Sequence, residues 1–355
     1  MKDKKVTLHH VAVAAGVSPS TVSRIARGSA RVSPEVRDRV LKAASKLGFS
    51  LLRTNKPKVV TFLLCNRDVL HYFHSRVLAG VEAYLAERDY YVLYLSFRYP
   101  PGARWQDIQL PQVLHRRDMV SGFIVAGTNT QSLLDLLTHR EVPFAVLGNN
   151  VLGEWKEKEY DTVWSDDPQG AYELTQYLQS LGHRDIWFVG NCQLAWYART
   201  YEGYRRAMLE ASLVPQLSSF DMPKEEDLGF LATKSVLSQG RPVTAIFAGG
   251  DVIARGVYRA LRDARLRVPE NISVVGFNDI EAENLHPSLT SAHVFCEQIG
   301  SHLAELLLAR INAPDQPARR FTIPTQVVKR ESCAPVAVRR ELSGADALQS
   351  MIVAP

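Results

Sequence analysis

Between residues 7 and 48, hydrophobic positions recur with the 3.6-residue period of short amphipathic helices. Three helices are predicted, over about 7–15, 18–27 and 33–47. The buried faces that this period predicts for the first two contain Val11, Ala12, Ala15, Val22 and Ile25. The intervening positions are polar or small, so each helix would place one side against its neighbours and the other in solvent.

Each predicted helix begins at a residue that suits the N-cap position. Thr7 precedes the first helix, while Ser18 and Ser33 each precede a proline, the residue best suited to the first helical position. Gly16 supplies the turn between the first two helices. Gly48 is expected to end the third helix in a left-handed conformation.

Beyond residue 57 the pattern changes to short apolar runs that alternate with amphipathic stretches. Seven runs predict strands: Val59–Leu64, Tyr91–Leu95, Gly122–Val125, Phe144–Leu147, Ile186–Val189, Ala245–Phe247 and Ser273–Val275. Amphipathic stretches predict helices, including Val77–Arg88, Ala171–Leu181, Ala254–Arg262 and Gly300–Ile311. This alternation predicts a parallel α/β fold. The strands are too many for one sheet of usual size, so we expect two lobes with a ligand-binding cleft between them.

The first two predicted helices and their glycine turn form a helix-turn-helix pattern, whose second helix would enter the major groove of DNA. Arg24 is the side chain best suited to read a guanine edge. The predicted DNA-contacting residues on the second helix and at helix starts are Thr7, Ser18, Pro19, Ser20, Thr21, Ser23, Arg24, Arg27 and Ser33. The alternative is a solvated three-helix bundle that carries its charge by accident.

Charge separates the two parts of the chain. Residues 1–58 contain 13 Lys and Arg against 3 Asp and Glu, a balance of +10, whereas the whole chain carries +5, so the remainder carries −5. A basic head on a mildly acidic body indicates a nucleic-acid-binding module joined to another domain. No apolar run is long enough to cross a bilayer and no secretion signal is recognisable, so we expect a cytoplasmic protein without a membrane partner.

Chemical motifs add little to this picture. The four cysteines are scattered, which favours reduced thiols over zinc ligation: Cys65, Cys192, Cys296 and Cys333. The Asp166-Asp167 pair, the glycine turn at 249–251 and the histidines at 71 and 74 match no catalytic or metal-binding motif. We therefore expect no enzymatic activity, no metal and no cofactor.

The segments AGVSPSTVSRI and RVSPEVRDRVLKAASKLGF resemble the headpiece of the lactose-repressor/galactose-repressor (LacI/GalR) family of bacterial transcription regulators. Later segments, such as those at 165–190 and 244–261, resemble the family's effector-binding core, and the resemblance extends to about Ser332. It implies a small all-α helix-turn-helix headpiece followed by a two-lobed α/β domain similar to periplasmic sugar-binding proteins. The implied divisions are a headpiece (1–48), a linker (49–58), the two-lobed domain (59–340) and a tail (341–355), with lobes of about 59–166 plus 292–322 and 167–291 plus 323–340.

The resemblance also implies a function. The protein would be a homodimeric repressor that binds double-stranded DNA at an inverted-repeat operator and responds to a small carbohydrate or nucleoside-like effector. Two alternatives stay open: a ligand-independent DNA binder with a vestigial pocket, and a ligand-binding protein without regulatory DNA binding. The tail is too short for a sustained heptad seam, which disfavours a coiled-coil tetramer.

The linker departs from the family pattern, because about six residues of the usual hinge helix are absent after Phe49. Leu52 aligns with the leucine that such a helix inserts into the minor groove. The alternatives are a single helical turn formed on DNA or an extended linker. Leu51 and Leu52 could instead pack against the body.

The predicted pocket departs as well. Thr200 replaces a common arginine, which is shifted to Arg199; Asn278 replaces a common aspartate; and Gly250-Asp251 replaces an Asn-Asp pair. These changes indicate either a ligand unlike the usual sugars or a weakened site. The predicted effector-binding residues are Tyr72, Phe73, Asp166, Trp196, Arg199 and Asn278.

Overall fold

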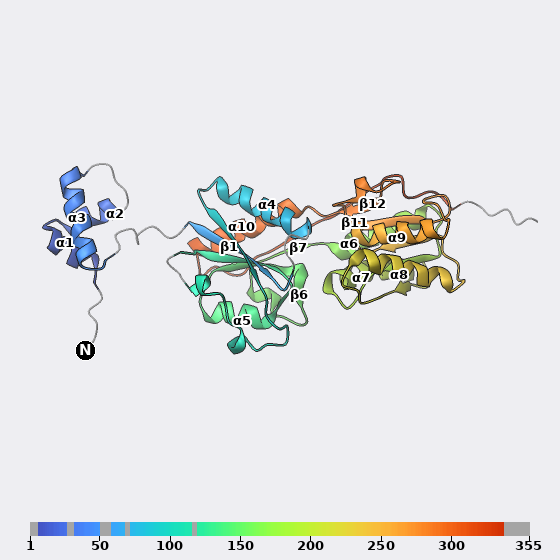
Figure 1. The fold of residues 1–355 in the computed structure, drawn as a ribbon, viewed down its shortest axis with the longest axis horizontal. Helices are drawn as coiled ribbons and strands as arrows, with labels where there is room; N and C mark the ends of the chain where they lie inside the picture. The colour runs from blue at the N-terminus through green and yellow to red at the C-terminus, as the bar shows by residue number, and fades with distance from the viewer. Residues whose placement is uncertain (1–5, 27–31, 50–57, 68–71, 116–118, 337–355) are drawn as a thin grey trace, which may run out of the picture.

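The computed structural model describes residues 6–26, 32–49, 58–67, 72–115 and 119–336. Its first part is the predicted bundle of three helices, α1 (Leu8–Ala15), α2 (Pro19–Ala26) and α3 (Pro34–Lys46) (Figure 1). The helices pack around Val11, Val22 and Val40, which are fully buried. The predicted inward faces of the first two helices are therefore confirmed.

Local signals in the sequence determine where these helices begin and end. The hydroxyl of Ser33 accepts a hydrogen bond from the backbone N–H of Val36 at 3.4 Å, which caps α3. Gly48 has φ +64°, and the N–H of Phe49 reaches back to the carbonyl of Ala44 at 2.8 Å. This is a Schellman ending, in which the left-handed residue is normally glycine.

The body contains two six-stranded sheets. In the first, all neighbouring strands are parallel, in the order β13 (Arg320–Ile323), β7 (Thr162–Ser165), β5 (Phe144–Leu147), β3 (Gly122–Gly127), β1 (Val59–Cys65) and β2 (Tyr91–Phe97). In the second, the order is β14 (Gln326–Val328), β12 (Thr290–His293), β11 (Ser273–Asn278), β10 (Ala245–Ala248), β8 (Ile186–Val189) and β9 (Gln216–Ser218), and only β14 is antiparallel to its neighbour. A two-stranded pair, β4 (Asn129–Thr130) and β6 (Val151–Leu152), lies in the first lobe.

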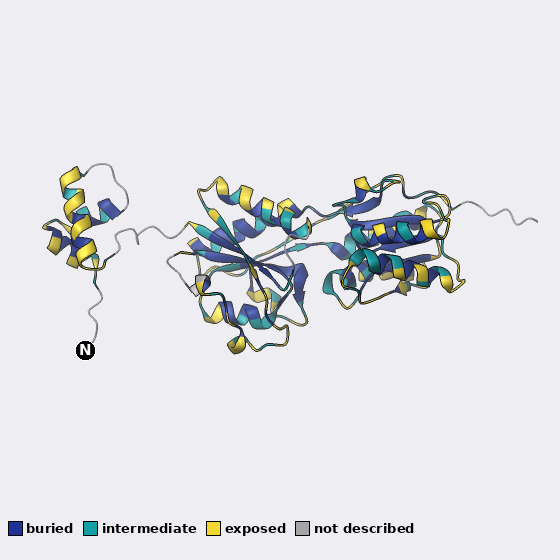
Figure 2. Ribbon diagram, in the orientation of Figure 1, coloured by how far each residue is buried: buried dark blue, intermediate teal, exposed yellow. Residues whose placement is uncertain are grey.

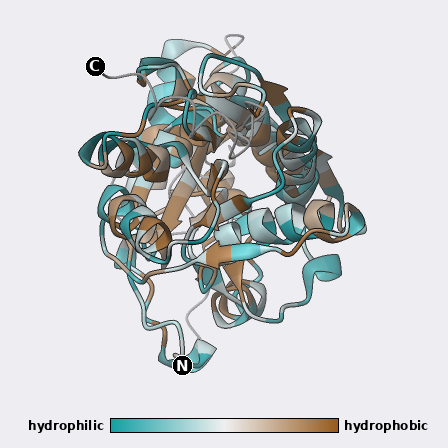
Figure 3. Cartoon of the chain, turned by 90° about the vertical axis from the view of Figure 1, so that its right-hand side faces the viewer, coloured by the Kyte–Doolittle hydropathy of each residue, from teal (hydrophilic) through white to brown (hydrophobic). Residues whose placement is uncertain are grey.

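Helices cover both faces of each sheet (Figures 1 and 2). The first sheet packs against α4 (Tyr72–Ala86) and α10 (Cys296–Asn312) on one face and α5 (Gln131–His139) on the other. The second packs against α6 (Asp167–Ser180) and α7 (Ala195–Glu210) on one face and α8 (Glu225–Ser238) and α9 (Asp251–Asp263) on the other. Sheets covered on both faces consist of near-continuous apolar runs, and Figure 3 shows such runs enclosed by more polar helices.

Two of the helix pairs cross at glycines. A Cβ atom on Gly300 of α10 would lie 2.0 Å from the carbonyl oxygen of Val77 in α4, and one on Gly256 of α9 would lie 2.0 Å from that of Glu226 in α8. Only glycine permits backbones to approach this closely. In both lobes, a glycine at the crossing point thus allows two helices to pack closely on the same face of the sheet.

The seven strands predicted from apolar runs are all present. The structure adds β7, β9, β12, β13 and β14 to the two large sheets, and also the two-residue strands β4 and β6. The five added sheet strands are three or four residues long and contain polar residues, so they do not stand out as apolar runs. α4 begins at Tyr72 rather than at the predicted position, residue 77. No helix within the described ranges is both long and apolar enough to span a membrane.

The chain passes between the two sheets three times: after β7, between β12 and α10, and between β13 and β14. α10 packs on the first sheet although it follows β12 of the second. Neither lobe is therefore a continuous stretch of sequence.

Candidate functional sites

α2 presents a polar surface on the headpiece. Pro19, Ser20 and Arg24 are exposed, whereas Thr21 and Ser23 are half-buried. The hydroxyl of Ser18 accepts from the backbone N–H of Thr21 at 3.2 Å, so Ser18 caps the helix. The exposed residues lie opposite the buried Val22 and Ile25, which leaves them available to a ligand as large as DNA.

Arg24 is the one basic residue of α2 and makes no ion pair with any described residue. Lys42 in α3, by contrast, is paired with Asp38 at 2.8 Å. An unpaired guanidinium loses no existing partner when it meets a phosphate or a guanine edge.

Two further predicted DNA contacts are exposed at helix starts. Thr7 precedes α1 and donates its backbone N–H to Nδ1 of His10 at 3.0 Å, while Ser33 precedes α3. The remaining two predicted contacts, Arg27 and Leu52, lie outside the described residues, as do the tail and most of the linker.

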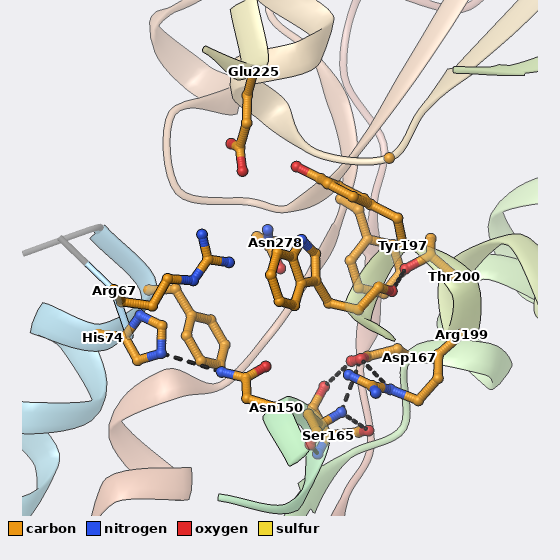
Figure 4. Close-up of a pocket in the computed structure, with 15 residues that line it drawn as sticks. Arg67, His74, Asn150, Ser165, Asp167, Tyr197, Arg199, Thr200, Glu225 and Asn278 are labelled. Atoms are coloured by element: carbon orange, nitrogen blue, oxygen red, sulfur yellow. Dashed lines mark hydrogen bonds and ion pairs between the residues drawn. The ribbon is translucent and has the colours of Figure 1, made fainter. Parts of the chain in front are cut away.

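A cavity lies between the lobes, next to the carboxyl ends of strands from both sheets, and about 570 Å³ of atom-free space, open solvent included, is enclosed by its lining residues. Figure 4 shows its lining side chains converging from the two sides. The first lobe supplies Arg67, Phe73, His74, Asn149, Asn150 and Ser165. The second supplies Asp167, Trp196, Tyr197, Arg199, Thr200, Glu225, Gly249, Phe277 and Asn278.

Asp167 is the centre of a polar network on one wall of the cavity. Its carboxylate accepts hydrogen bonds from Ser165 Oγ at 2.6 Å and Asn149 Nδ2 at 2.8 Å, and pairs with Arg199 Nε at 3.3 Å. Asn149 also joins the backbone of Ser165 through both ends of its amide. The network fixes the position of Arg199 by joining the last strand before the lobe crossing to α7.

On the opposite wall, Arg67 of the first lobe stacks over the indole ring of Trp196 of the second, with the guanidinium carbon 3.9 Å from the ring centroid. Burial lowers the pKa of Arg67, and the charge of Glu225 opposes that shift. Burial also raises the pKa of Tyr197 well above its usual value. This wall is therefore a dry cation–aromatic contact between the lobes.

Four of the six predicted effector-binding residues line the cavity: Phe73, Trp196, Arg199 and Asn278. Tyr72 lines an adjoining cavity instead, which shares Arg67, Glu225 and Asn278 with the first. Asp166 lies outside both cavities and caps α6, accepting from the N–H of Gln169 at 3.3 Å. Of the two adjacent aspartates, Asp167 is the one that lines the cavity, because the turn into α6 directs consecutive side chains in different directions.

Two further positions belong to the segments that depart from the family pattern: Thr200, and Asp251 of the Gly250-Asp251 pair. Thr200 lines the cavity but donates its hydroxyl to the carbonyl of Trp196 at 2.9 Å. Asp251 accepts from the backbone N–H of Ile280 at 2.6 Å and from Ser291 Oγ at 2.8 Å, and burial raises its pKa to about 7. Asp251 thus anchors the segment that follows Asn278.

Sequence reasoning missed several lining residues. Arg67 and Asn149 follow β1 and β5, so the rule that ligands bind beyond the carboxyl ends of parallel strands could have found them. His74 is buried on α4, where Asn150 Nδ2 lies 3.1 Å from its Nε2. Nothing in the local pattern marks Glu225, which reaches the cavity from the start of α8.

Comparison with known proteins identifies the architecture. The sequence profile for bacterial regulatory proteins of the lacI family matches residues 7–50, and that for a periplasmic binding protein-like domain matches residues 175–333. The chain belongs to the LacI family. Within this LacI-family protein, the first match falls on the helix-turn-helix headpiece. The second begins inside α6 and covers most of the second lobe together with α10 and β13, which pack in the first.

Curated relatives match over almost their whole length. The HTH-type transcriptional repressor PurR of Vibrio cholerae serotype O1 is 27% identical over 338 residues, covering 92% of this chain and 97% of the relative. The ribose operon repressor of Haemophilus influenzae is 29% identical over 341 residues, covering 92% and 98%. These relatives of the LacI-family chain are transcriptional regulators.

No group of three or more metal-ligating side chains is found within the described residues.

Solved structures agree with this membership. A complex of the transcriptional regulator CelR with cellobiose is 27% identical, with a TM-score of 0.66, and the match covers 92% of this chain and all of that one. The lac repressor dimer bound to operator and the anti-inducer ONPF is 21% identical, with a TM-score of 0.69 and coverage of 93% and 100%. The latter likeness shows that the fold is shared.

Proposed function

We propose that this LacI-family protein is a transcriptional repressor that binds an operator through its headpiece and changes its affinity when a small polar molecule occupies the cavity between the lobes. The observation that carries the proposal is the presence, in one chain, of an exposed basic recognition helix and a polar cavity built from two lobes. Such a protein works in the cytoplasm, where its DNA is.

The headpiece supports the DNA-binding half of the proposal. The exposed residues of α2 include a small hydroxyl group that permits close approach to the duplex and one guanidinium that makes no ion pair with the residues the structure describes. We assign Pro19, Ser20 and Arg24 to the positions nearest the bases. A two-fold dimer would present two such helices to an inverted repeat.

The cavity supports the effector half. Phe73 and Trp196 offer aromatic surface, while Arg199 and Asn278 offer polar groups, a combination that suits a sugar-like or nucleoside-like molecule. The relatives include a ribose operon repressor and a cellobiose-bound regulator. Because both lobes line the cavity, an occupant favours one arrangement of the lobes over another and thereby alters the spacing of the headpieces.

A mobility-shift assay with genomic fragments at moderate salt tests the DNA-binding half, with light scattering to establish the dimer. We expect a small set of fragments to bind well above background, and Arg24→Ala to lose the preference among them. Failure to select any fragment would leave a ligand-binding protein without regulatory DNA binding.

A panel of sugars, sugar acids and nucleosides tests the effector half, with melting temperature and operator affinity measured in parallel. We expect one compound class to change both. A protein that selects an operator but responds to no compound would instead be a ligand-independent DNA binder.

A further inference from the structure

Formal charge does not reveal which compound class fits the cavity. Its lining contains two guanidinium groups, Arg67 and Arg199, and two carboxylates, Asp167 and Glu225, so these charges sum to zero. A neutral sugar would satisfy that balance. The hydrogen-bonding state of the four groups, however, differs between the cations and the anions.

The carboxylates already have donors. Asp167 receives hydrogen bonds from Ser165 and Asn149 and pairs with Arg199. Glu225 receives a side-chain hydrogen bond from Tyr197. No buried oxygen of a lining carboxylate lacks a partner among the described residues. The acidic groups of the lining therefore have little need of a ligand's donors.

The guanidinium groups have donors to spare. Nη2 of Arg199 and Nε of Arg67 are both buried and have no hydrogen-bond partner among the described residues. Only 18% of the Arg199 side chain is exposed, and Arg67 rests on the ring of Trp196. Burial without a partner is more costly for a charged group than for a neutral one. The unmet demand of the cavity is thus for an acceptor, and above all for an anion.

We propose that the effector is an acid: a sugar-like molecule whose carboxylate or phosphate binds the guanidinium groups of Arg199 and Arg67. Its remaining surface lies against the aromatic residues Phe73 and Trp196. An anionic acceptor matches the planar donor fork of arginine better than a hydroxyl group does, because it accepts two hydrogen bonds and neutralises the charge. This inference rests on the proposed function, since it names the class of ligand that the same cavity binds.

Matched pairs of compounds that differ in one charged group test the proposal. We would titrate the full-length protein by calorimetry with D-glucuronate and D-glucose, D-galacturonate and D-galactose, D-gluconate and D-glucitol, and D-ribose 5-phosphate and D-ribose. We expect the acid of at least one pair to bind at least about tenfold more tightly than its neutral partner. The carboxylate and phosphate arms then show which anion the cavity takes.

Arginine variants connect the preference to the cavity. Arg199→Gln and Arg67→Gln should each weaken binding of that acid at least about tenfold, and should weaken binding of its neutral partner by a smaller factor. Arg205→Gln is the matched control, because it removes an exposed arginine from the same helix, α7. If Arg199→Gln does not fold because Asp167 loses its partner, the double variant Asp167→Asn/Arg199→Gln removes both charges together.

The proposal is overturned if no acid binds, if neutral partners bind as tightly as acids, or if acid binding is the same in Arg67→Gln, Arg199→Gln and the Arg205→Gln control. Operator release by a neutral sugar or nucleoside, without any response to acids, overturns this inference and leaves the proposed function standing. An acid that binds tightly but never alters operator affinity supports an acid-binding cavity and overturns the proposed function.

Discussion

The headpiece and the cavity are built on opposite principles. Every described residue that we assign to DNA contact lies between positions 7 and 33, and the exposed face of one eight-residue helix carries most of them. The cavity instead gathers side chains from Arg67 to Asn278, contributed by two sheets, by α4 of the first lobe and by three helices of the second. One site is local in sequence, and the other exists only after the whole body has folded.

Because of this difference, removing a side chain has different effects on the fold at the two sites. A headpiece contact can be removed without disturbing the fold, because its side chain is already in solvent. A cavity residue such as Asp167 is tied to three other side chains, so its removal disturbs the wall that it belongs to. The comparison predicts that stability and ligand binding are coupled in the body, whereas stability and DNA contact are separable in the headpiece.

The largest expected effect is on the free energy of unfolding, when a large side chain is removed from the core of the second lobe. Phe188 in β8 is fully buried and packs against Tyr201, Tyr204 and Phe247. Phe188→Ala should lower the free energy of unfolding of the body by about 3–5 kcal/mol, as large buried truncations do. Tryptophan fluorescence in urea measures this directly, because all five tryptophans lie outside residues 1–58.

The control is Leu231→Ala, which truncates a side chain that is 40% exposed. At urea concentrations where the Phe188→Ala body is still folded, operator binding should be unchanged. If operator affinity fell in proportion to the stability of the body, DNA contact and body stability would not be separable.

A smaller effect is expected from the headpiece surface. Arg24→Ala should reduce discrimination between the operator and a single-base variant by about 1–3 kcal/mol, because a bidentate arginine–guanine contact is worth that much. Competition binding measures the discrimination, and urea unfolding should be unchanged. Lys42→Ala is the control, since Lys42 is paired with Asp38 in α3. Equal loss of discrimination in both variants would mean that Arg24 supplies charge alone.

The smallest effect tests whether a predicted DNA contact also has a structural role. Ser33→Ala removes the N-cap of α3 and should destabilise the headpiece by about 1 kcal/mol, whereas Ser33→Gly should cost only a few tenths. Amide hydrogen exchange in α3 measures the difference. If operator affinity falls equally in the two variants while exchange differs, the hydroxyl contacts DNA as well as capping the helix.

The sequence was informative wherever structure depends on neighbours along the chain. The caps at Ser18 and Ser33, the glycine at 48 and the apolar runs of the central strands follow from local rules, and all are confirmed. The strands β7 and β9 were missed because polar residues interrupt them, whereas equally short strands such as β8 are apolar throughout.

The cavity could be predicted only in outline. Asp166 was chosen over Asp167 because a linear sequence does not show which of two adjacent side chains a helix start turns inward. Arg67 and Glu225 were missed because their meeting depends on how two lobes close on each other, which no periodicity records. The family resemblance located the region, but not the side chains that replace the usual anchors.

The two last strands have a consequence for how the protein is made. β13 and β14 are separated by only two residues, yet each forms the outer strand of a different sheet. During synthesis, the last strand of each sheet is therefore added within the same few codons, near residue 328. Neither sheet can be complete before that point. A frameshift or stop a little before residue 320 would leave β7 and β12 as bare edges on both sheets at once, the kind of surface on which unfinished chains pair with one another. One short segment near the end of the described body thus covers an edge of each sheet.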